Sequence, residues 1–212
     1  MLILASASNA RHRLLLQVGI DHDVIVSNIN EESFYMDEVK DLVTTLATEK
    51  AKNVAFKILK KYSETKYFRN IEAVLGCDSL FEFNGIILGK PSNQKEAIQR
   101  LKALSSQSGF LHTGHCLLDS NFSKDACKFN FINNIQTDVI TTKIVFSSIS
   151  DIEIEKYVSS GESLQCAGGF SLDGKGASFI QSIEGCYSNV IGLSLPWLTK
   201  AIKEAKNKRS ST

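Results

Sequence analysis

The chain has 212 residues, of which 43% are hydrophobic and 22% are charged, and its 24 basic and 23 acidic side chains give a formal net charge of +1. A chain of this length and composition buries a substantial core, which excludes a disordered protein. The near-neutral balance provides no overall field for attracting a nucleic acid or an anionic membrane. An anionic ligand must therefore be held by local charges, which favours a small molecule.

Cysteine usage and the N-terminal segment predict a cytoplasmic protein. The five cysteines lack CxxC spacing and do not cluster with histidine, so neither a disulfide framework nor a zinc site is indicated. The apolar segment MLILA is too short to span a bilayer and has no basic residues before it, unlike a secretory signal. We expect one domain over residues 1–204, with two lobes around a cleft, and a frayed basic tail over residues 205–212.

The first third of the chain predicts a strand, a polar turn and a helix, followed by a much longer helix. Residues 1–5 form an apolar run typical of a buried strand, and the turn SASN then leads into RHRLLLQVG, which has helical spacing. Residues 24–27 predict a second short strand. From residue 37 to about residue 60, apolar side chains recur at helical spacing, which indicates a long amphipathic helix.

The rest of the chain alternates between strands and helices. Asn84-Gly85 is a strong hairpin signal, Ser92 is a candidate N-cap, and Ser150 with Glu153 forms a capping box that opens a helix ending near Gly161. The segment LSLPWLTKAIKEA predicts a closing helix. Strands are expected at residues 71–75, 80–83, 86–88, 110–118 and 137–146. This order predicts an α/β fold with a long twisted mixed sheet, helices on both sides and a central cleft.

The turn after the first strand has the composition of a phosphate site. Ser6 and Ser8 offer hydroxyl groups where a strand leads into a helix, and Arg11 and the helix N-terminus add positive charge. The alternative is ordinary N-capping of the helix by Ser8 or Asn9. For the two serines alone, this capping interpretation is preferred over a phosphate site.

Two charged residues occupy positions where apolar residues are expected. Lys50 lies on the apolar stripe of the long helix, so it either contacts a ligand or packs its stem on the core while its ammonium reaches solvent. Asp78 closes an apolar strand, where ligands collect in open α/β sheets, but an aspartate at that point can also cap a turn.

Glu31 and Lys90 complete the set of candidates, although each has an ordinary alternative as a solvated loop residue. The GxxxxGK phosphate loop and the GxSxG nucleophile elbow are absent, and the histidines lack metal-ligand spacing. Carboxylates, lysines and a serine/arginine turn remain, which is the combination that metal-assisted phosphoryl chemistry requires.

The motifs in their order resemble the Maf family of nucleoside triphosphate pyrophosphatases. The resemblance runs from Leu4 to about Leu198 through LASASNARHRLL, LATEKA, GCDSL, NGIILGKP, LSSQSGFLHTG, CAGGFSLDGKGASFI and EGCYSNVIGLSLPWL. It implies the α/β fold shared with the inosine triphosphate pyrophosphatases, with a nucleotide in the cleft. It also implies hydrolysis of a nucleoside triphosphate to a monophosphate and pyrophosphate, in a house-cleaning role that keeps non-canonical nucleotides out of nucleic acids.

The resemblance assigns roles to the candidates residue by residue. Ser6, Ser8 and Arg11 match the phosphate-binding turn. Asp78 matches the proton acceptor, and the catalytic cluster comprises Glu31, Lys50, Asp78 and Lys90. A divalent cation, Mg2+ or Mn2+, would be held by Glu31 and Asp78. A homodimer is also compatible with the resemblance.

Substrate choice is left open because the base-specificity positions are mixed. Asn9 replaces the usual proline, and Ala10 replaces an arginine of the dTTP/UTP-type subgroup or an aromatic residue of the 7-methyl-GTP-type subgroup. Ser79 resembles the first subgroup, whereas Cys166 and Asp173 resemble the second. A carboxylate accepts hydrogen bonds only, so Asp173 favours GTP, 7-methyl-GTP or CTP over dTTP.

Two alternatives remain from the sequence alone. One is a nucleotide-binding regulator of cell division or septum formation with vestigial hydrolysis, which the intact catalytic cluster disfavours. The other is an enzyme of the inosine triphosphate type, which the GCDSL and CAGGF segments disfavour.

Overall fold

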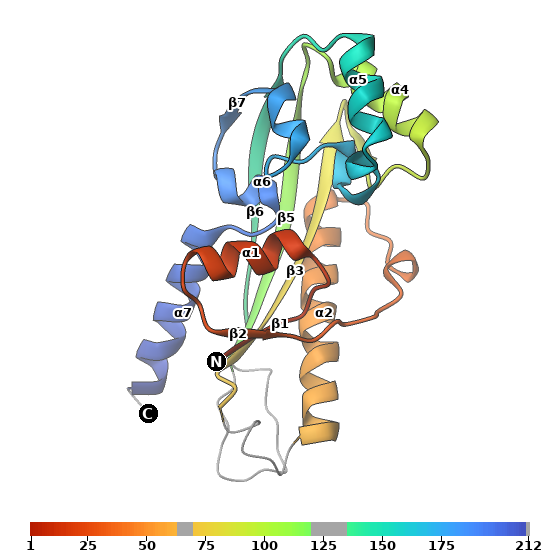
Figure 1. The fold of residues 1–212 in the computed structure, drawn as a ribbon. Coiled ribbons are helices and arrows are strands. Elements are labelled where there is room, and N and C mark those ends of the chain that lie inside the picture. The colour runs from red at the N-terminus through yellow and green to blue at the C-terminus, as the bar shows by residue number, and fades with distance from the viewer. Residues whose placement is uncertain (63–69, 120–134, 211–212) are drawn as a thin grey trace. The chain divides into compact units, whose positions relative to one another are not determined.

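The computed structural model describes residues 1–62, 70–119 and 135–210, in which helices are interspersed among the strands along the chain (Figure 1). The strands are β1 (Leu2–Leu4), β2 (His22–Val24), β3 (Ala73–Phe83), β4 (Ile86–Leu88), β5 (Ser108–Asp119), β6 (Ile135–Phe146) and β7 (Ile180–Glu184). The α-helices are α1 (Asn9–Gln17), α2 (Val39–Tyr62), α4 (Gln94–Leu104), α5 (Asp151–Ser159), α6 (Tyr187–Ile191) and α7 (Leu195–Ser210). Short 3-10 helices are η1 (Glu31–Ser33), η3 (Glu162–Gln165), η4 (Ala167–Gly169) and η5 (Lys175–Phe179).

Within these residues the strands form one seven-stranded mixed sheet. Its order is β2-β1-β3-β5-β6-β7, and β4 pairs with β3. Strand β1 is parallel to β2 and β3, whereas β4 runs antiparallel to β3 and β7 antiparallel to β6. The predicted α/β class, with a mixed sheet flanked by helices, is confirmed. The predicted central cleft stays a prediction.

The chain divides into two compact units. Unit 1 comprises Met1–Asp78, Gly114–Val139 and Leu193–Thr212, and unit 2 comprises Ser79–Thr113 and Ile140–Gly192. Strands β3, β5 and β6 therefore each contribute residues to both units.

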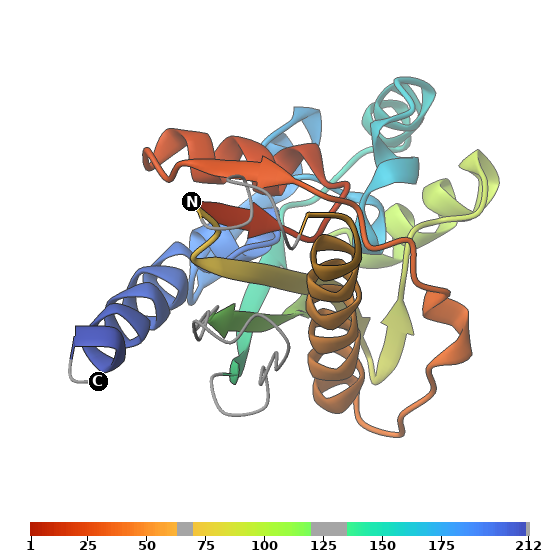
Figure 2. The same ribbon diagram turned by 90° about the horizontal axis from the view of Figure 1, so that it is seen from below.

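In unit 1, helices α2 and α7 lie on opposite faces of the sheet (Figure 2). The apolar stripe of α2 packs on β1, β3 and β5, as its helical spacing predicts. Two glycines allow a close approach: a Cβ at Gly76 would lie 2.0 Å from the carbonyl oxygen of Ala47, and one at Gly114 would lie 2.1 Å from that of Val43. This contact sets the height of α2 above the sheet.

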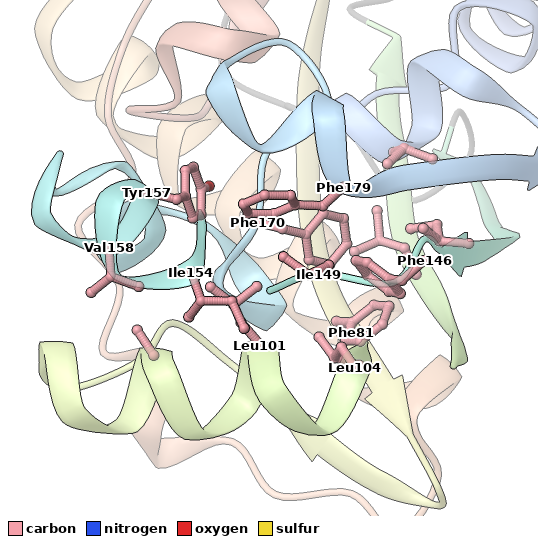
Figure 3. Packing of buried hydrophobic residues seen from close by; sticks show 14 residues of the cluster. Phe81, Leu101, Leu104, Phe146, Ile149, Ile154, Tyr157, Val158, Phe170 and Phe179 are labelled. Atoms are coloured by element: carbon pink, nitrogen blue, oxygen red, sulfur yellow. The ribbon is translucent and has the colours of Figure 1, made fainter. Parts of the chain in front are cut away.

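Unit 2 has an aromatic core between the sheet and helices α4 and α5 (Figure 3). Phe81, Phe146 and Phe170 meet edge to face, with ring centroids 5.0–6.1 Å apart. Leu101 and Leu104 of α4 close the core on one side, where Figure 3 shows them pointing toward the aromatic rings. Such burial of aromatic and aliphatic surface is the main stabilising term of this unit.

Several predicted local features are confirmed. Asn84 and Gly85 both have positive φ, 51° and 75°, as a two-residue hairpin turn of this kind requires, and β3 and β4 pair across them. The capping box is present, with the Ser150 hydroxyl and the Glu153 carboxylate each bonding the other residue's backbone.

Other predicted boundaries were wrong. Strand β2 occupies His22–Val24 rather than 24–27, because it pairs in register with β1; the carbonyls of Val26 and Ser27 instead accept hydrogen bonds from Lys57. The N-cap of α4 is Asn93 rather than Ser92. Helix α7 extends to Ser210 and includes the buried Ala205, and fraying of the tail over residues 205–212 stays a prediction.

No helix in residues 1–62, 70–119 and 135–210 combines the length and apolar character needed to cross a membrane.

Candidate functional site

The turn between β1 and α1 is a closed hydrogen-bonded unit. Ser6 and Arg11 are both buried, and the Ser6 hydroxyl oxygen accepts bonds from the Arg11 guanidinium (2.9 Å) and from the Ser8 backbone N–H (3.3 Å). Ser8 is the N-cap of α1 and accepts from the Arg11 backbone N–H. The capping interpretation of Ser8 is confirmed, and a hydroxyl, a guanidinium and a helix N-terminus converge in the same turn.

An ion cluster centred on the buried pair of Lys50 and Asp78 lies on the face of α2 that meets the sheet. The Lys50 ammonium is 2.5 Å from Asp78 Oδ1 and 2.7 Å from Glu31 Oε1. Lys50 and Asp78 are 7% and 6% exposed, whereas the Glu31 side chain is 54% exposed. The alternative in which Lys50 packs its stem and reaches solvent is therefore wrong, and Glu31 is paired rather than merely solvated.

Asp78 lies in the middle of β3, not at the end of a strand, so the expectation that it closes a strand was wrong. The sequence predicted a break between two strands at Gly76-Cys77-Asp78, but β3 continues through these residues. Gly76 allows the close contact with α2 and does not form a turn. The alternative of a turn-capping aspartate fails as well, because the carboxylate pairs with Lys50.

The electrostatics of this cluster suit proton transfer. Burial raises the pKa of the Asp78 carboxyl above its usual value, and the charges of Lys50 and Arg11 oppose that rise. The positive charge of Arg11 therefore stabilises the ionised Asp78 carboxylate, as the charge of Lys50 does. Burial also raises the pKa of the adjacent Cys77 to about 11, so this thiol is neutral near pH 7 and is not a thiolate nucleophile.

The donor set at Glu31 and Asp78 fits a hard divalent cation. Both carboxylates converge on one positive centre, the Lys50 ammonium, and each has a second oxygen with which it could bind a cation. In the described residues no group of three or more His, Cys, Asp or Glu side chains could hold a metal by itself. Mg2+ in nucleotide enzymes is commonly held by one or two carboxylates together with substrate phosphates, and this pair matches that pattern.

The other predicted site residues are distributed between the units. Ala10 is half-buried in the first turn of α1, in unit 1. Lys90, Ser79 and Asp173 belong to unit 2, where Lys90 and Asp173 are exposed. The Asp173 carboxylate accepts from the Ser171 hydroxyl at 2.7 Å. Lys90 and Asp173 both act electrostatically on Cys166, whose pKa is raised to about 11 mainly by burial.

The sequence reasoning missed a buried polar network beside Ser79. Its hydroxyl pairs with that of Thr113 at 2.9 Å, and the Asn189 amide donates to the Ile140 carbonyl (2.9 Å) and the Thr142 hydroxyl (3.1 Å). Thr113 and Thr142 are fully buried, but β5 and β6 contain several other polar residues, so the sequence does not single these two out. Which polar groups would meet was not visible without the strand register.

Comparisons with known proteins agree along almost the whole chain. A family model described as "Maf-like protein" matches residues 1–205. A protein of Prochlorococcus marinus named "Nucleoside triphosphate pyrophosphatase" is 52% identical over 206 residues, which is 97% of each chain. One of the same name from a Synechococcus species is 44% identical over 200 residues, covering 94% of this chain and 98% of the relative.

Among solved structures, one described as "The structure of the Staphylococcus aureus Ham1 protein" matches with a TM-score of 0.34 and 14% identity, covering 71% of this chain and 72% of that one.

Proposed function

The chain belongs to the Maf-like protein family, and from that premise we propose that it is a nucleoside triphosphate pyrophosphatase, a hydrolase acting on an acid anhydride. The observation that carries the proposal is the buried pair of Lys50 and Asp78, 2.5 Å apart, in the same unit as the buried Arg11–Ser6 turn. Burying two charges costs free energy, and a catalytic role is one reason for a chain to retain them. The family match to residues 1–205 supports treating both units as one functional domain.

The proposed reaction is attack of water on the α-phosphorus of the substrate. The water oxygen forms the new P–O bond, its proton passes to the Asp78 carboxylate, and the bond to the departing pyrophosphate breaks. A raised pKa brings a carboxyl closer to neutral pH, which strengthens it as a base. Lys50 holds the Asp78 carboxylate in place through its 2.5 Å contact.

The departing pyrophosphate gains negative charge, and the cations of the chain would offset it. We propose that Arg11, Lys50 and Lys90 do so, with the Ser6 and Ser8 hydroxyls and the α1 N-terminus binding phosphate oxygens. Glu31 and Asp78 would hold a Mg2+ or Mn2+ ion, which when bound supplies charge neutralisation of the triphosphate.

The test is an assay for released pyrophosphate with canonical and modified nucleoside triphosphates, in Mg2+, in Mn2+ and in excess chelator. We expect a monophosphate and pyrophosphate with either cation and no turnover with chelator, because otherwise two carboxylates would face the triphosphate without a neutralising cation. Nucleotide binding without any hydrolysis would favour the alternative, a regulator of division or septum formation. Release of orthophosphate would contradict the proposal.

For the base we propose that Asp173, Ala10 and Ser79 determine specificity, with GTP, 7-methyl-GTP or CTP preferred over dTTP. The exposed Asp173 carboxylate accepts hydrogen bonds only, so it favours bases that present N–H donors, whereas carbonyl groups of thymine opposite it would cost about 1–3 kcal/mol. We expect the small side chain of Ala10 to admit a larger purine. Values of kcat/KM for these nucleotides in wild type and in Asp173→Gln test this, and a ranking that the substitution leaves unchanged would contradict it.

The proposed role is the removal of modified or non-canonical nucleotides, in the cytoplasm, without a nucleic acid or membrane partner. A homodimer remains compatible with this role.

A further inference from the structure

The carbonyl group that immediately precedes Lys90 is held from two sides. The oxygen of Gly89 accepts a hydrogen bond from the Arg100 guanidinium at 2.6 Å and another from the Gly168 backbone N–H at 3.2 Å. All of these residues belong to unit 2. A carbonyl with two donors has both lone pairs used, so the backbone entering Lys90 is fixed in direction.

Arg100 is itself fixed by helix α4. Its side chain is only 16% exposed, and its guanidinium also pairs with the Glu96 carboxylate, one turn earlier in the helix. Glu96 accepts from the Ser92 hydroxyl (2.5 Å) and the Ser92 backbone N–H (2.8 Å). These bonds, with the contribution of Arg100, lower the pKa of Glu96 to about 2, so the carboxylate is ionised throughout the neutral range.

The segment after Lys90 is held as well. Pro91 is buried, and a Cβ at Gly169 would lie 3.2 Å from Pro91 Cγ, so the backbone at Gly169 packs closely on the proline ring. Gly168 and Gly169 have φ of 72° and 82°, values that favour glycine. Lys90 is therefore an exposed lysine between two fixed neighbours.

We propose that Arg100 is a positioning residue, which acts through the Gly89 carbonyl to fix the backbone from which Lys90 reaches the triphosphate. The inference rests on the proposed function, because it takes Lys90 to contact the substrate. A lysine ammonium is a point charge on a flexible stem, so its placement depends on where its backbone is anchored. A displacement of about 1 Å in a catalytic group can cost about a hundredfold in rate.

The experiment compares kcat and KM for pyrophosphate release in wild type, Arg100→Met, Lys90→Met and the double variant. We expect Arg100→Met to lower kcat by about tenfold or more while KM stays within about threefold. In the Lys90→Met background, Arg100→Met should lower kcat by less than about twofold, because the group that it positions is already gone. A residue that only stabilised the unit would reduce kcat by the same factor in both backgrounds.

Two further variants complete the design. Arg100→Lys keeps one donor for the Gly89 carbonyl but cannot make the forked contact, so we expect an intermediate kcat. Lys102→Met, on the same helix, removes an exposed cation that pairs with Asp151 and should leave kcat unchanged. Circular dichroism verifies folding. If Arg100→Met does not fold, Arg100→Lys decides, and a wild-type kcat in that variant would overturn the proposal.

The two proposals fail in different ways. An active wild type with kcat unaffected in Arg100→Met, or with independent effects of Arg100 and Lys90, overturns the positioning role alone. A wild type that releases no pyrophosphate overturns the proposed function and the positioning role together.

Discussion

Asp78 is the residue on which the proposed chemistry depends most directly, and Asp78→Asn separates its charge from its shape. The substitution is nearly isosteric and keeps an oxygen near Lys50, so we expect the fold to survive. Turnover should fall by two to three orders of magnitude, about 3–4 kcal/mol of barrier, because the proton acceptor is lost. Steady-state kinetics and a urea unfolding curve measure the two quantities.

Asp41→Asn is the matched control, because Asp41 is an exposed aspartate on α2. It should leave turnover unchanged and lower stability by no more than about 0.3–1 kcal/mol, because Asp41 is an acidic residue in the first turn of α2. Near-normal turnover in Asp78→Asn would return Asp78 to a purely structural role.

Lys50→Met tests how strongly Asp78 depends on its partner. Removing the ammonium leaves a carboxyl buried without the cation that stabilises its charge, which typically costs about 3–5 kcal/mol. The pKa of Asp78, already raised by burial, should rise further. A folded-state pKa above the unfolded value adds stability at low pH that is lost as pH rises through the folded pKa.

The variant should therefore be closest to wild type in stability near pH 4 and least stable relative to it near pH 8. Urea unfolding at both pH values measures the difference. A deficit that is the same at both would show that Asp78 does not take up a proton when Lys50 is removed.

At the scale of elements, the position of Lys50 depends on how closely α2 approaches the sheet. Gly76→Ala puts a Cβ against the Ala47 carbonyl, so α2 must shift. We expect a loss of about 1–3 kcal/mol in stability and a lower kcat, because Lys50 moves with the helix. The control is Lys52→Ala, which changes an exposed residue of α2 that pairs with Glu49 at the surface. Thermal unfolding and steady-state kinetics of both variants test this prediction. A melting temperature and kcat in Gly76→Ala equal to those of wild type would show that the position of Lys50 does not depend on this close approach.

Elements with a strong local signal were predictable from sequence. The long apolar stripe gave α2, and Asn84-Gly85 and Ser150 with Glu153 marked a hairpin and a capped helix whose determinants lie within four residues. Strand boundaries were less predictable, because pairing decides them. Val24 belongs to β2 and Val26 does not, since β2 pairs with Leu2–Leu4, and apolar content alone does not distinguish these positions.

At the scale of the whole molecule, the residue types that make up the candidate site were easier to predict from sequence than the contacts between them. Lys50 and Asp78 stood out as charged residues in apolar segments. Glu31 was a candidate with a solvated-loop alternative, and the resemblance to the Maf family, now confirmed, assigned it to the catalytic cluster. The Lys50 ammonium contacts both carboxylates because α2, β3 and η1 meet at this point. The local sequence pattern of each element does not show where the three elements meet. Arg100 was missed for the same reason, because its carbonyl partner lies eleven residues earlier, outside its helix.

The central claim is that the chain directs water to the α-phosphorus of a nucleoside triphosphate. Hydrolysis in water enriched in oxygen-18, with mass spectrometry of both products, tests it most directly. We predict one oxygen-18 atom in the monophosphate and none in the pyrophosphate, and loss of this turnover in Asp78→Asn. Label in the pyrophosphate, or label in released orthophosphate, would contradict the account.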